Sequence, residues 1–315
     1  MANVEFGKIG VLCGGDSNER QISLSSGKAV YAALKEKGLD VIFIDLPNKS
    51  QTKDIVLSSG LSLAFIALHG GFGEDGTIQA MLDEIAVPYT GSGAQASSLA
   101  FDKWASKQIF KRNGFPTPCS RVVLKDDVVG VESLDFLCRE FGFPFVVKPV
   151  KEGSSIGMSL VRTESDLKKS IDEAFSYDKQ VLIEKYIKGE DITVGVLGNM
   201  VLPIVHIKPR SEFYDYNAKY NDSLTKYVVP ADISKEITSQ AQELGLRVHN
   251  AIGCRGFSRV DMILDEHNNI FVLELNSIPG LTSSSLLPKA ADAAGISFGE
   301  LCVRMCELAM SPVKV

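Results

Sequence analysis

The sequence lacks the features that would point to a nucleic acid or a membrane as its main partner. No run of clustered Lys and Arg residues occurs, and the net charge is −6 with a pI near 5.4, whereas phosphate backbones and anionic bilayers attract clustered cations. No 18 consecutive apolar residues occur, and residues 1–5 do not form a charged region that leads into an apolar one. We therefore expect a cytoplasmic protein that binds neither nucleic acid nor a membrane.

Paired cysteines are also missing, because the six cysteines include no Cys-x-x-Cys motif. Scattered cysteines favour reduced, mostly buried thiols over disulfides or a zinc site. Cys302 and Cys306 lie four residues apart in a helical segment, a spacing that is typical of a buried helix face. No internal repeat or low-complexity segment interrupts the chain. Its 315 residues, 45% of them hydrophobic, can bury a sizeable core and suggest two or three domains.

The first hundred residues alternate between apolar strands and helices. A strand over Lys8–Cys13 is followed by a glycine turn, an amphipathic helix over Ile22–Lys37, and further strands over Val41–Leu46 and Leu63–Leu68. This alternation predicts an α/β domain with a parallel sheet. The glycine-rich segment His69–Gly76 follows a strand, and loops at the carboxyl ends of parallel strands form the binding crevice.

The rest of the chain predicts a helix after Asp102 and then mixed strands and helices. The expected strands are Phe145–Pro149, Met158–Val161, Val181–Lys185, Thr193–Leu197 and Val201–Ile207, and the expected helices are Ser165–Phe175, Ser234–Ile252 and two closing helices.

Two segments near the end, Phe257–Leu264 and Ile270–Ser277, predict a β-hairpin with a polar face. A loop over residues 266–269 places Asp261 opposite Glu274 and Arg259 opposite Asn276, on the same side of the sheet. Oxygen ligands in this pattern suit a hard divalent cation such as Mg²⁺, and an arginine beside them suits an anion. The alternative is a solvated sheet face. The other face should be the core side, and it carries Val260, Met262, Leu264, Phe271, Leu273 and Leu275.

Three further segments have both a functional and a simpler interpretation. Lys148 with residues 151–157 could hold phosphate oxygens on backbone N–H groups, or could be an ordinary hairpin turn. The strand end Glu184–Ile187 could read a purine edge, or could be a charged strand end. The aromatic segment Glu212–Tyr220 is either a lid over a ligand or a surface hairpin.

These segments occur together, and in the same order, in a known family. The chain resembles the D-alanine–D-alanine ligases of the ATP-grasp superfamily over nearly its whole length. The resemblance is carried by Gly14–Arg20, His69–Gly76, Lys148 with Glu152–Gly157, Phe213–Tyr220, Arg259 with Asp261, and Glu274-x-Asn276-x-x-Pro279-Gly280.

The resemblance implies an α/β fold, α+β in part, with three-domain ATP-grasp architecture. Residues 1–102 would form an N-terminal Rossmann-like domain, residues 103–186 a central ATP-grasp subdomain, and residues 187–315 a C-terminal subdomain with the metal and substrate site. The implied reaction uses ATP to phosphorylate the carboxylate of one D-alanine, after which the amine of a second displaces phosphate. The dipeptide feeds peptidoglycan synthesis. A cytoplasmic homodimer is implied.

The resemblance also implies roles for single residues. Two Mg²⁺ ions, with Mn²⁺ as a possible replacement, would be held by Asp261, Glu274 and Asn276. The ATP site would comprise Lys103, Lys148, Ser155, Glu184, Lys185, Tyr186, Ile187, Asp191, Phe213 and Lys219. Many relatives carry Trp at the position of Tyr186 and Glu at that of Asp191.

For the amino acids, Glu19 would orient the ammonium group of the first D-alanine and would link to Ser154 and Tyr220. Arg259 and the backbone N–H of Gly280 would stabilise the oxyanion. The second substrate would be bound by His69, Ser285 and Leu286.

Three alternative functions remain at this point. A sister enzyme would join D-alanine to D-lactate or D-serine, although a tyrosine at position 220 favours D-alanine. Another carboxylate–amine ligase is disfavoured by Glu19 and by the pair Ser285-Leu286. A nonenzymatic ATP-binding module would be expected to lose the metal ligands, and all three are present.

Overall fold

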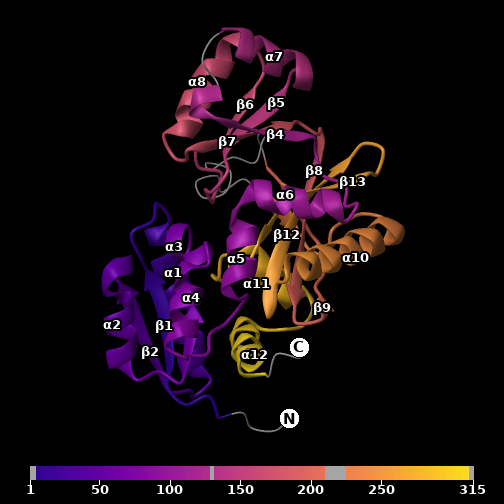
Figure 1. Ribbon diagram of the computed structural model, residues 1–315. Coiled ribbons are helices and arrows are strands. Elements are labelled where there is room, and N and C mark those ends of the chain that lie inside the picture. The colour runs from indigo at the N-terminus through magenta and orange to yellow at the C-terminus, as the bar shows by residue number, and fades with distance from the viewer. Residues whose placement is uncertain (1–4, 128–130, 210–224, 312–315) are drawn as a thin grey trace.

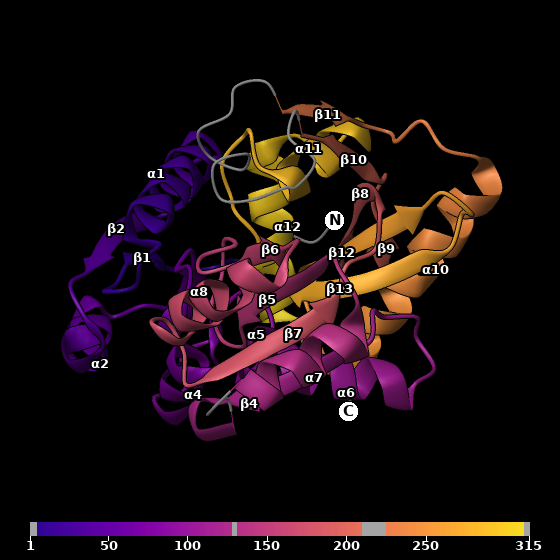
Figure 2. The ribbon, with the colours of Figure 1, turned by 90° about the horizontal axis from the view of Figure 1, so that it is seen from above.

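The described part of the protein contains three β-sheets. The computed structural model describes residues 5–127, 131–209 and 225–311. Figure 1 shows the N-terminal sheet and its helices at the lower left, the smaller lobe with α7 and α8 at the top, and the third sheet beside α10 at the right. Figure 2, seen from above, shows that the first and third parts flank the smaller lobe.

The N-terminal sheet is parallel, with the strand order β2-β1-β3. The strands match the predicted α/β alternation: β1 and β3 are apolar segments buried on both faces, whereas the edge strand β2 leaves Asp45 exposed. A helix over Lys49–Ser59 had no counterpart among the expected elements; Asn48 caps its first turn and Gly60, with φ +59°, ends it. The elements are β1 (Ile9–Gly14), α1 (Arg20–Glu36), β2 (Val41–Leu46), α2 (Lys49–Ser59), β3 (Leu63–Ile66), α3 (Gly71–Glu74) and α4 (Thr77–Glu84).

The smaller lobe is an antiparallel sheet in the order β4-β7-β5-β6. On one face, Phe145, Val147 and Ile183 pack under the helices. Lys148 and Glu184 stand on the opposite face, because side chains alternate along a strand and Val146 pairs with Glu184. The elements are β4 (Ser120–Leu124), α7 (Val131–Phe141), β5 (Phe145–Pro149), β6 (Ser159–Val161), α8 (Glu164–Phe175) and β7 (Gln180–Lys185).

The third sheet is antiparallel, with the order β11-β10-β8-β12-β13 and β9 beside β8. The helix α10 covers its apolar face, and its Ala241 and Val248 join the core that contains Val260 and Met262. The elements are β8 (Gly189–Leu197), β9 (Met200–Val201), β10 (Val205–Lys208), β11 (Lys226–Val228), α10 (Lys235–Ile252), β12 (Phe257–Asp265), β13 (Ile270–Asn276), α11 (Leu286–Ala293) and α12 (Phe298–Met310).

The hydrophobic cores join parts of the chain that are far apart in sequence. Ala96 and Ala100 of α5 (Ala94–Phe101) and Phe110 of α6 (Lys103–Arg112) pack in the core of the third sheet. The closing helix α12 packs against α1, and its Cys302 and Cys306 are fully buried in the core that also contains residues of β1. The prediction of a buried helix face is confirmed, and all six cysteines are free thiols. Within the described ranges, no helix has the length and hydropathy needed to cross a membrane.

The predicted hairpin register is confirmed at its polar end, where Arg259 pairs with Asn276 and Asp261 with Glu274. The predicted core face is wrong at Phe271 and Leu273, because the register shifts between Asp261 and Met262 and Met262 pairs with Val272 instead. A β-bulge of this kind adds one residue to a strand and re-aims its side chains. Val272 is therefore buried in the core, whereas Leu273 turns into a cavity.

The buried side chain of His249 should make the folded protein less stable at low pH. Its ring lies buried on α10, with Nδ1 2.7 Å from Ser258 Oγ, and burial lowers its pKa from 6.5 to about 4. Between these values the unfolded chain binds the extra proton and the folded chain does not, so the free energy of unfolding falls as pH falls from 6.5 to 4, by up to roughly 3 kcal/mol. We expect the Tm of His249→Gln, measured by calorimetry, to fall less than the Tm of the wild type between pH 6.5 and pH 4.

The matched control is His267→Gln, at an exposed hairpin loop. It should track the wild type at every pH. Equal slopes for all three proteins would show that His249 does not contribute to acid destabilisation.

Candidate active site

A cavity of about 610 Å³ opens between the N-terminal part, the smaller lobe and the third sheet. Every site residue predicted from the sequence and present among the described ranges lines it. These residues are Glu19, His69, Lys103, Lys148, Ser154, Ser155, Glu184, Lys185, Tyr186, Ile187, Asp191, Arg259, Asp261, Glu274, Asn276, Gly280, Ser285 and Leu286. Phe213, Lys219 and Tyr220, also predicted as site residues, lie outside the described residues.

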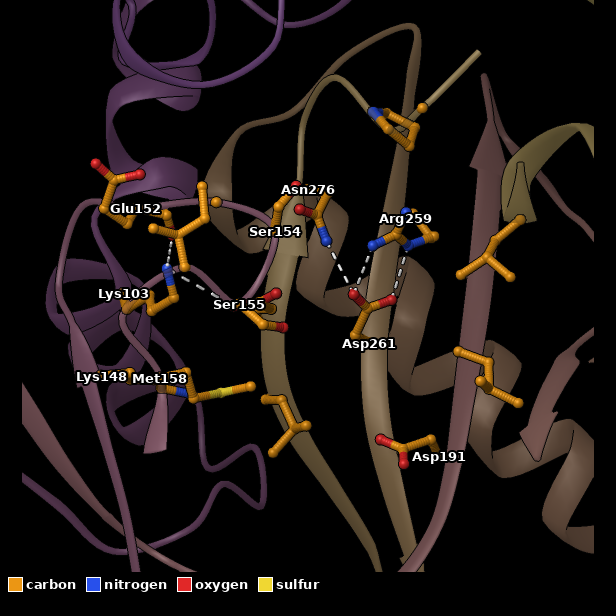
Figure 3. A pocket seen from close by; sticks show the side chains of 18 of the residues that line it. Lys103, Lys148, Glu152, Ser154, Ser155, Met158, Asp191, Arg259, Asp261 and Asn276 are labelled. Carbon is orange, nitrogen blue, oxygen red and sulfur yellow. Dashed lines mark hydrogen bonds and ion pairs between the residues drawn. The ribbon is translucent and has the colours of Figure 1, made fainter. Parts of the chain in front are cut away.

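The polar face of the β12–β13 hairpin forms one wall of this cavity. Arg259 donates through Nε and Nη2 to the two oxygens of Asp261, at 2.8 and 2.7 Å. Asn276 Nδ2 donates to Asp261 Oδ2 at 3.0 Å, and Thr193 Oγ1 on β8 donates to Oδ1 at 2.6 Å. Figure 3 shows Arg259 and Asn276 turned toward Asp261. Four donors thus fix the orientation of this carboxylate.

The bulge in β13 brings Glu274 to the same wall. Both Leu273 and Glu274 line the cavity, although consecutive strand residues normally face opposite sides. The Glu274 carboxylate lies 3.9 Å from Lys103 Nζ, which also donates to the backbone carbonyl of Glu152. The carboxylates of Asp261 and Glu274 and the amide of Asn276 supply the oxygen donors that hard divalent cations prefer, so the residues fit a Mg²⁺ site. No group of three or more His, Cys, Asp or Glu residues that could hold a metal ion occurs in the described ranges.

The opposite wall carries positive charge from the smaller lobe. Lys148 Nζ lies 2.6 Å from Glu184 Oε2, and both side chains are nearly fully buried. Burial alone would lower the pKa of Lys148, but attraction by Glu184 and Glu274 raises it above the usual value. Burial would likewise raise the pKa of Glu184, but Lys107 and Lys148 lower it. Both groups are therefore charged at neutral pH.

The turn between β5 and β6 closes over Glu19, which is 6% exposed. Ser154 and Ser155 have φ values of +50° and +59°, in the left-handed region that non-glycine residues rarely adopt. The Ser154 hydroxyl donates to the Glu19 carboxylate, so the turn is tied to the N-terminal part. A Cβ at Gly153 would overlap that carboxylate, which explains why glycine stands there.

The loop before α11 meets the N-terminal part at His69. Its Nε2 lies 2.8 Å from Ser26 Oγ, and its Nδ1 lies 3.5 Å from Glu74 Oε1. Ser26 Oγ also accepts from the backbone N–H of Leu281, at 3.2 Å, next to Gly280. His69 is therefore held between a carboxylate on one side and a hydroxyl that contacts the Gly280 loop on the other.

Comparison with known proteins identifies the family. Family models described as D-ala D-ala ligase N-terminus and D-ala D-ala ligase C-terminus match residues 8–60 and 48–92, and residues 109–307. The chain is 43% identical over 310 residues to the D-alanine--D-alanine ligase of Pelotomaculum thermopropionicum, with 96% of each chain covered. The chain belongs to the D-alanine–D-alanine ligase family.

Solved structures of D-alanine–D-alanine ligases also match the fold. The crystal structure of the enzyme from Bacillus anthracis has a TM-score of 0.85 at 37% identity, with 96% of this chain and 97% of that chain covered. A crystal structure of D-alanine--D-alanine ligase from Bacillus anthracis complexed with ATP has a TM-score of 0.83 at 34% identity, covering 96% of this chain and 97% of that one. The predictions of an α/β ATP-grasp fold and of an ATP-dependent ligase are confirmed.

Several residues in or beneath the cavity wall were not singled out from the sequence. Glu74 beside His69 stands in the predicted glycine-rich loop, but no pattern in that loop singles it out. Lys107 is buried beneath Glu184 and looks in sequence like one more lysine on an exposed helix face. Apolar residues complete the lining: Val146, Met158, Ile192, Ile207, Ile263 and Leu273.

Proposed function

We propose that this protein joins two D-alanine molecules to D-alanyl-D-alanine, releasing ADP and phosphate, for peptidoglycan precursor synthesis. The observation that carries the proposal is that one cavity is lined by the buried Lys148 of the smaller lobe, by Lys103 of α6, and by the Arg259–Asp261–Asn276 group of the hairpin. Phosphoryl transfer needs positioning and charge neutralisation more than covalent chemistry. An acyl-transfer step needs, in addition, a donor for the developing oxyanion.

The nucleotide would lie between the smaller lobe and the hairpin. Lys103 and Lys148 would contact the α- and β-phosphates, with Ser155 in the adjoining turn. The segment Glu184–Ile187 would frame adenine at the end of β7, and Asp191 on β8 would bind the ribose. Support comes from the apolar lining beside these residues and from the ATP complex of the related Bacillus anthracis enzyme. Phe213 and Lys219 complete the proposed nucleotide site.

Asp261, Glu274 and Asn276 would hold the two Mg²⁺ ions. When bound, such ions neutralise charge on the β- and γ-phosphates. The protein's own residues then position the reactants. Arg259, held by both oxygens of Asp261, keeps its guanidinium in a fixed orientation at the cavity wall.

The proposed reaction has two steps. A carboxylate oxygen of the first D-alanine attacks the γ-phosphorus of ATP, and ADP leaves. The amine nitrogen of the second D-alanine then attacks the acyl carbon, loses a proton, and inorganic phosphate leaves with the electrons of the broken C–O bond. Arg259 and the N–H of Gly280 would stabilise the oxyanion between these events.

The two D-alanine molecules would bind to different groups of residues. Glu19 would hold the ammonium group of the first D-alanine, with Ser154 and Tyr220 closing over it. His69, Ser285 and Leu286 would bind the second, and Ser285 stands at the N-terminus of α11, where free N–H groups attract a carboxylate. The Ser154–Glu19 and Ser26–Leu281 contacts support this division.

A D-serine acceptor is the main alternative. The VanG D-Ala:D-Ser ligase of Enterococcus faecalis matches with a TM-score of 0.82 at 28% identity, covering 96% of this chain and 99% of that one. The fold alone therefore does not choose the acceptor. The higher identity to ligases named for D-alanine favours D-alanine.

The test is a phosphate-release assay with D-Ala, L-Ala, D-Lac and D-Ser as acceptors, with products identified by mass. We expect ATP-dependent D-Ala-D-Ala as the main product. D-Ala-D-Ser as the main product would replace the proposed acceptor, and phosphate release independent of any amino acid would contradict ligation. We also propose the division into residues 1–102, 103–186 and 187–315, a homodimer, and a cytoplasmic location.

A further inference from the structure

Lys107 is a fully buried lysine that lies beneath the cavity rather than in its lining. It stands one helical turn after Lys103 on α6, and its side chain is 0% exposed. Burying an ammonium group is unfavourable unless the group is paired and hydrogen-bonded. Lys107 must therefore be explained by the groups that it contacts.

One ammonium group here joins three parts of the fold. Lys107 Nζ forms an ion pair with Glu184 Oε1 on β7 and donates to Thr117 Oγ1 at 2.8 Å. The Thr117 hydroxyl donates in turn to the carbonyl of Val272 on β13, also at 2.8 Å. Val272 adjoins the bulge that turns Glu274 into the cavity. The network thus runs from α6 to both walls of the site.

Glu184 is shared between two lysines. Its Oε1 faces Lys107, and its Oε2 lies 2.6 Å from Lys148 Nζ, so the group of three carries a net positive charge. Without Lys107, Glu184 would neutralise Lys148, and this pair would present no net charge to an anion. With Lys107 present, Lys148 remains effectively positive toward the cavity.

The protonation states agree with this arrangement. Burial lowers the pKa of Lys107 to about 8, because desolvation and repulsion from Lys148 outweigh attraction by Glu184. Lys107 is therefore charged at neutral pH but loses its proton in mildly alkaline solution.

We propose that Lys107 is a positioning residue for the nucleotide: it holds one oxygen of Glu184 and offsets its charge, so that Lys148 is fixed in place and stays positive toward the triphosphate. The inference rests on the proposed function, because it takes Lys148 as a phosphate ligand. If Lys107 only tied α6 to the two sheets, its loss would lower stability without a selective loss of affinity for the β- and γ-phosphates.

The experiment compares nucleotides that differ in phosphate number. Lys107→Gln keeps hydrogen-bonding groups beside Glu184 and Thr117 but removes the charge, whereas Lys107→Arg keeps the charge. We expect Lys107→Gln to raise the dissociation constant of AMPPNP on the order of tenfold and that of AMP by much less. A change of this size corresponds to the loss of one unit charge that acts on the phosphates through partly buried protein. Lys107→Arg should stay near the wild type. Calorimetric titration of the full chain with Mg²⁺ measures both dissociation constants.

The matched control is Lys111→Gln, four residues further along α6 and solvent-exposed, which should leave both constants unchanged. The double variant Lys107→Gln/Glu184→Gln should regain the AMPPNP-to-AMP preference, because no carboxylate then neutralises Lys148. Equal losses for AMP and AMPPNP in Lys107→Gln, or no recovery in the double variant, would overturn the proposal.

A second measurement needs no variant. The charged groups that act on Lys107 are Glu184, Lys148 and Glu274, and Lys103 and Lys111 stand four residues away on its own helix. In the wild type, the preference for AMPPNP over AMP should fall as pH rises through about 8, because Lys107 loses its proton there. A constant preference from about pH 7 to 9 overturns the inference, whereas a wild type that binds no AMPPNP at all contradicts the proposed function instead.

Discussion

Glu274→Gln is expected to lower the rate of phosphate release by about 10²-fold or more, while leaving the fold nearly intact. The substitution keeps the size of the side chain and removes one negative charge from the proposed metal ligands, a loss comparable with that of a major electrostatic stabiliser. The fold should persist because the core side of β13, which carries Val272 and Leu275, is untouched. The measurement is a phosphate-release assay over a series of Mg²⁺ concentrations, together with Tm.

The matched control is Glu266→Gln, the same change in the exposed loop of the same hairpin, where the side chain is 72% exposed. This variant should keep the wild-type rate. AMPPNP binding by Glu274→Gln should also need more Mg²⁺ than the wild type, which gives a measurement independent of turnover. Near-normal phosphate release by Glu274→Gln at ordinary Mg²⁺ concentrations would sink the assignment of Glu274 as a metal ligand.

The polar wall of the hairpin could be predicted because local rules determine it. A short loop fixes which residues pair, and the period of two then places Arg259, Asp261, Glu274 and Asn276 on one face. The bulge could not be predicted in this way. The run Phe271-Val272-Leu273 is apolar throughout, so the pattern does not show which residue is the extra one; packing against α10 selects Val272 for the core.

Contacts between distant segments were beyond reasoning from local patterns. Lys103, Lys107 and Lys111 recur every four residues on α6, a pattern typical of a solvated helix face. Only the fold places Glu184 against Lys107 and turns a lysine of that series inward. The contact between Glu19 and Ser154 likewise joins residues that are 135 positions apart, and it was inferred from family resemblance alone.

Arg259→Lys is expected to lower kcat on the order of 10²-fold with little change in the KM for ATP. Arginine binds both oxygens of Asp261 at once, at 2.8 and 2.7 Å, so its guanidinium is held rigidly at the cavity wall. Lysine keeps the positive charge but is a flexible point donor that cannot form this fork. An oxyanion-stabilising group that has lost its orientation mainly raises the barrier of the chemical step, which is measured as kcat.

A matched control is Arg121, which also donates two hydrogen bonds to one carboxylate but lies outside the cavity. Arg121 on β4 donates through Nε and Nη2 to Glu140 at 2.7 and 2.8 Å, but its side chain is 46% exposed and does not line the cavity. Arg121→Lys should therefore leave kcat unchanged, since exposed ion pairs contribute little. If Arg259→Lys kept a kcat within a few-fold of the wild type, the positive charge alone would suffice at this position. The fork with Asp261 would then serve to hold the hairpin wall together, and the oxyanion would have to be stabilised by other donors, such as the N–H of Gly280.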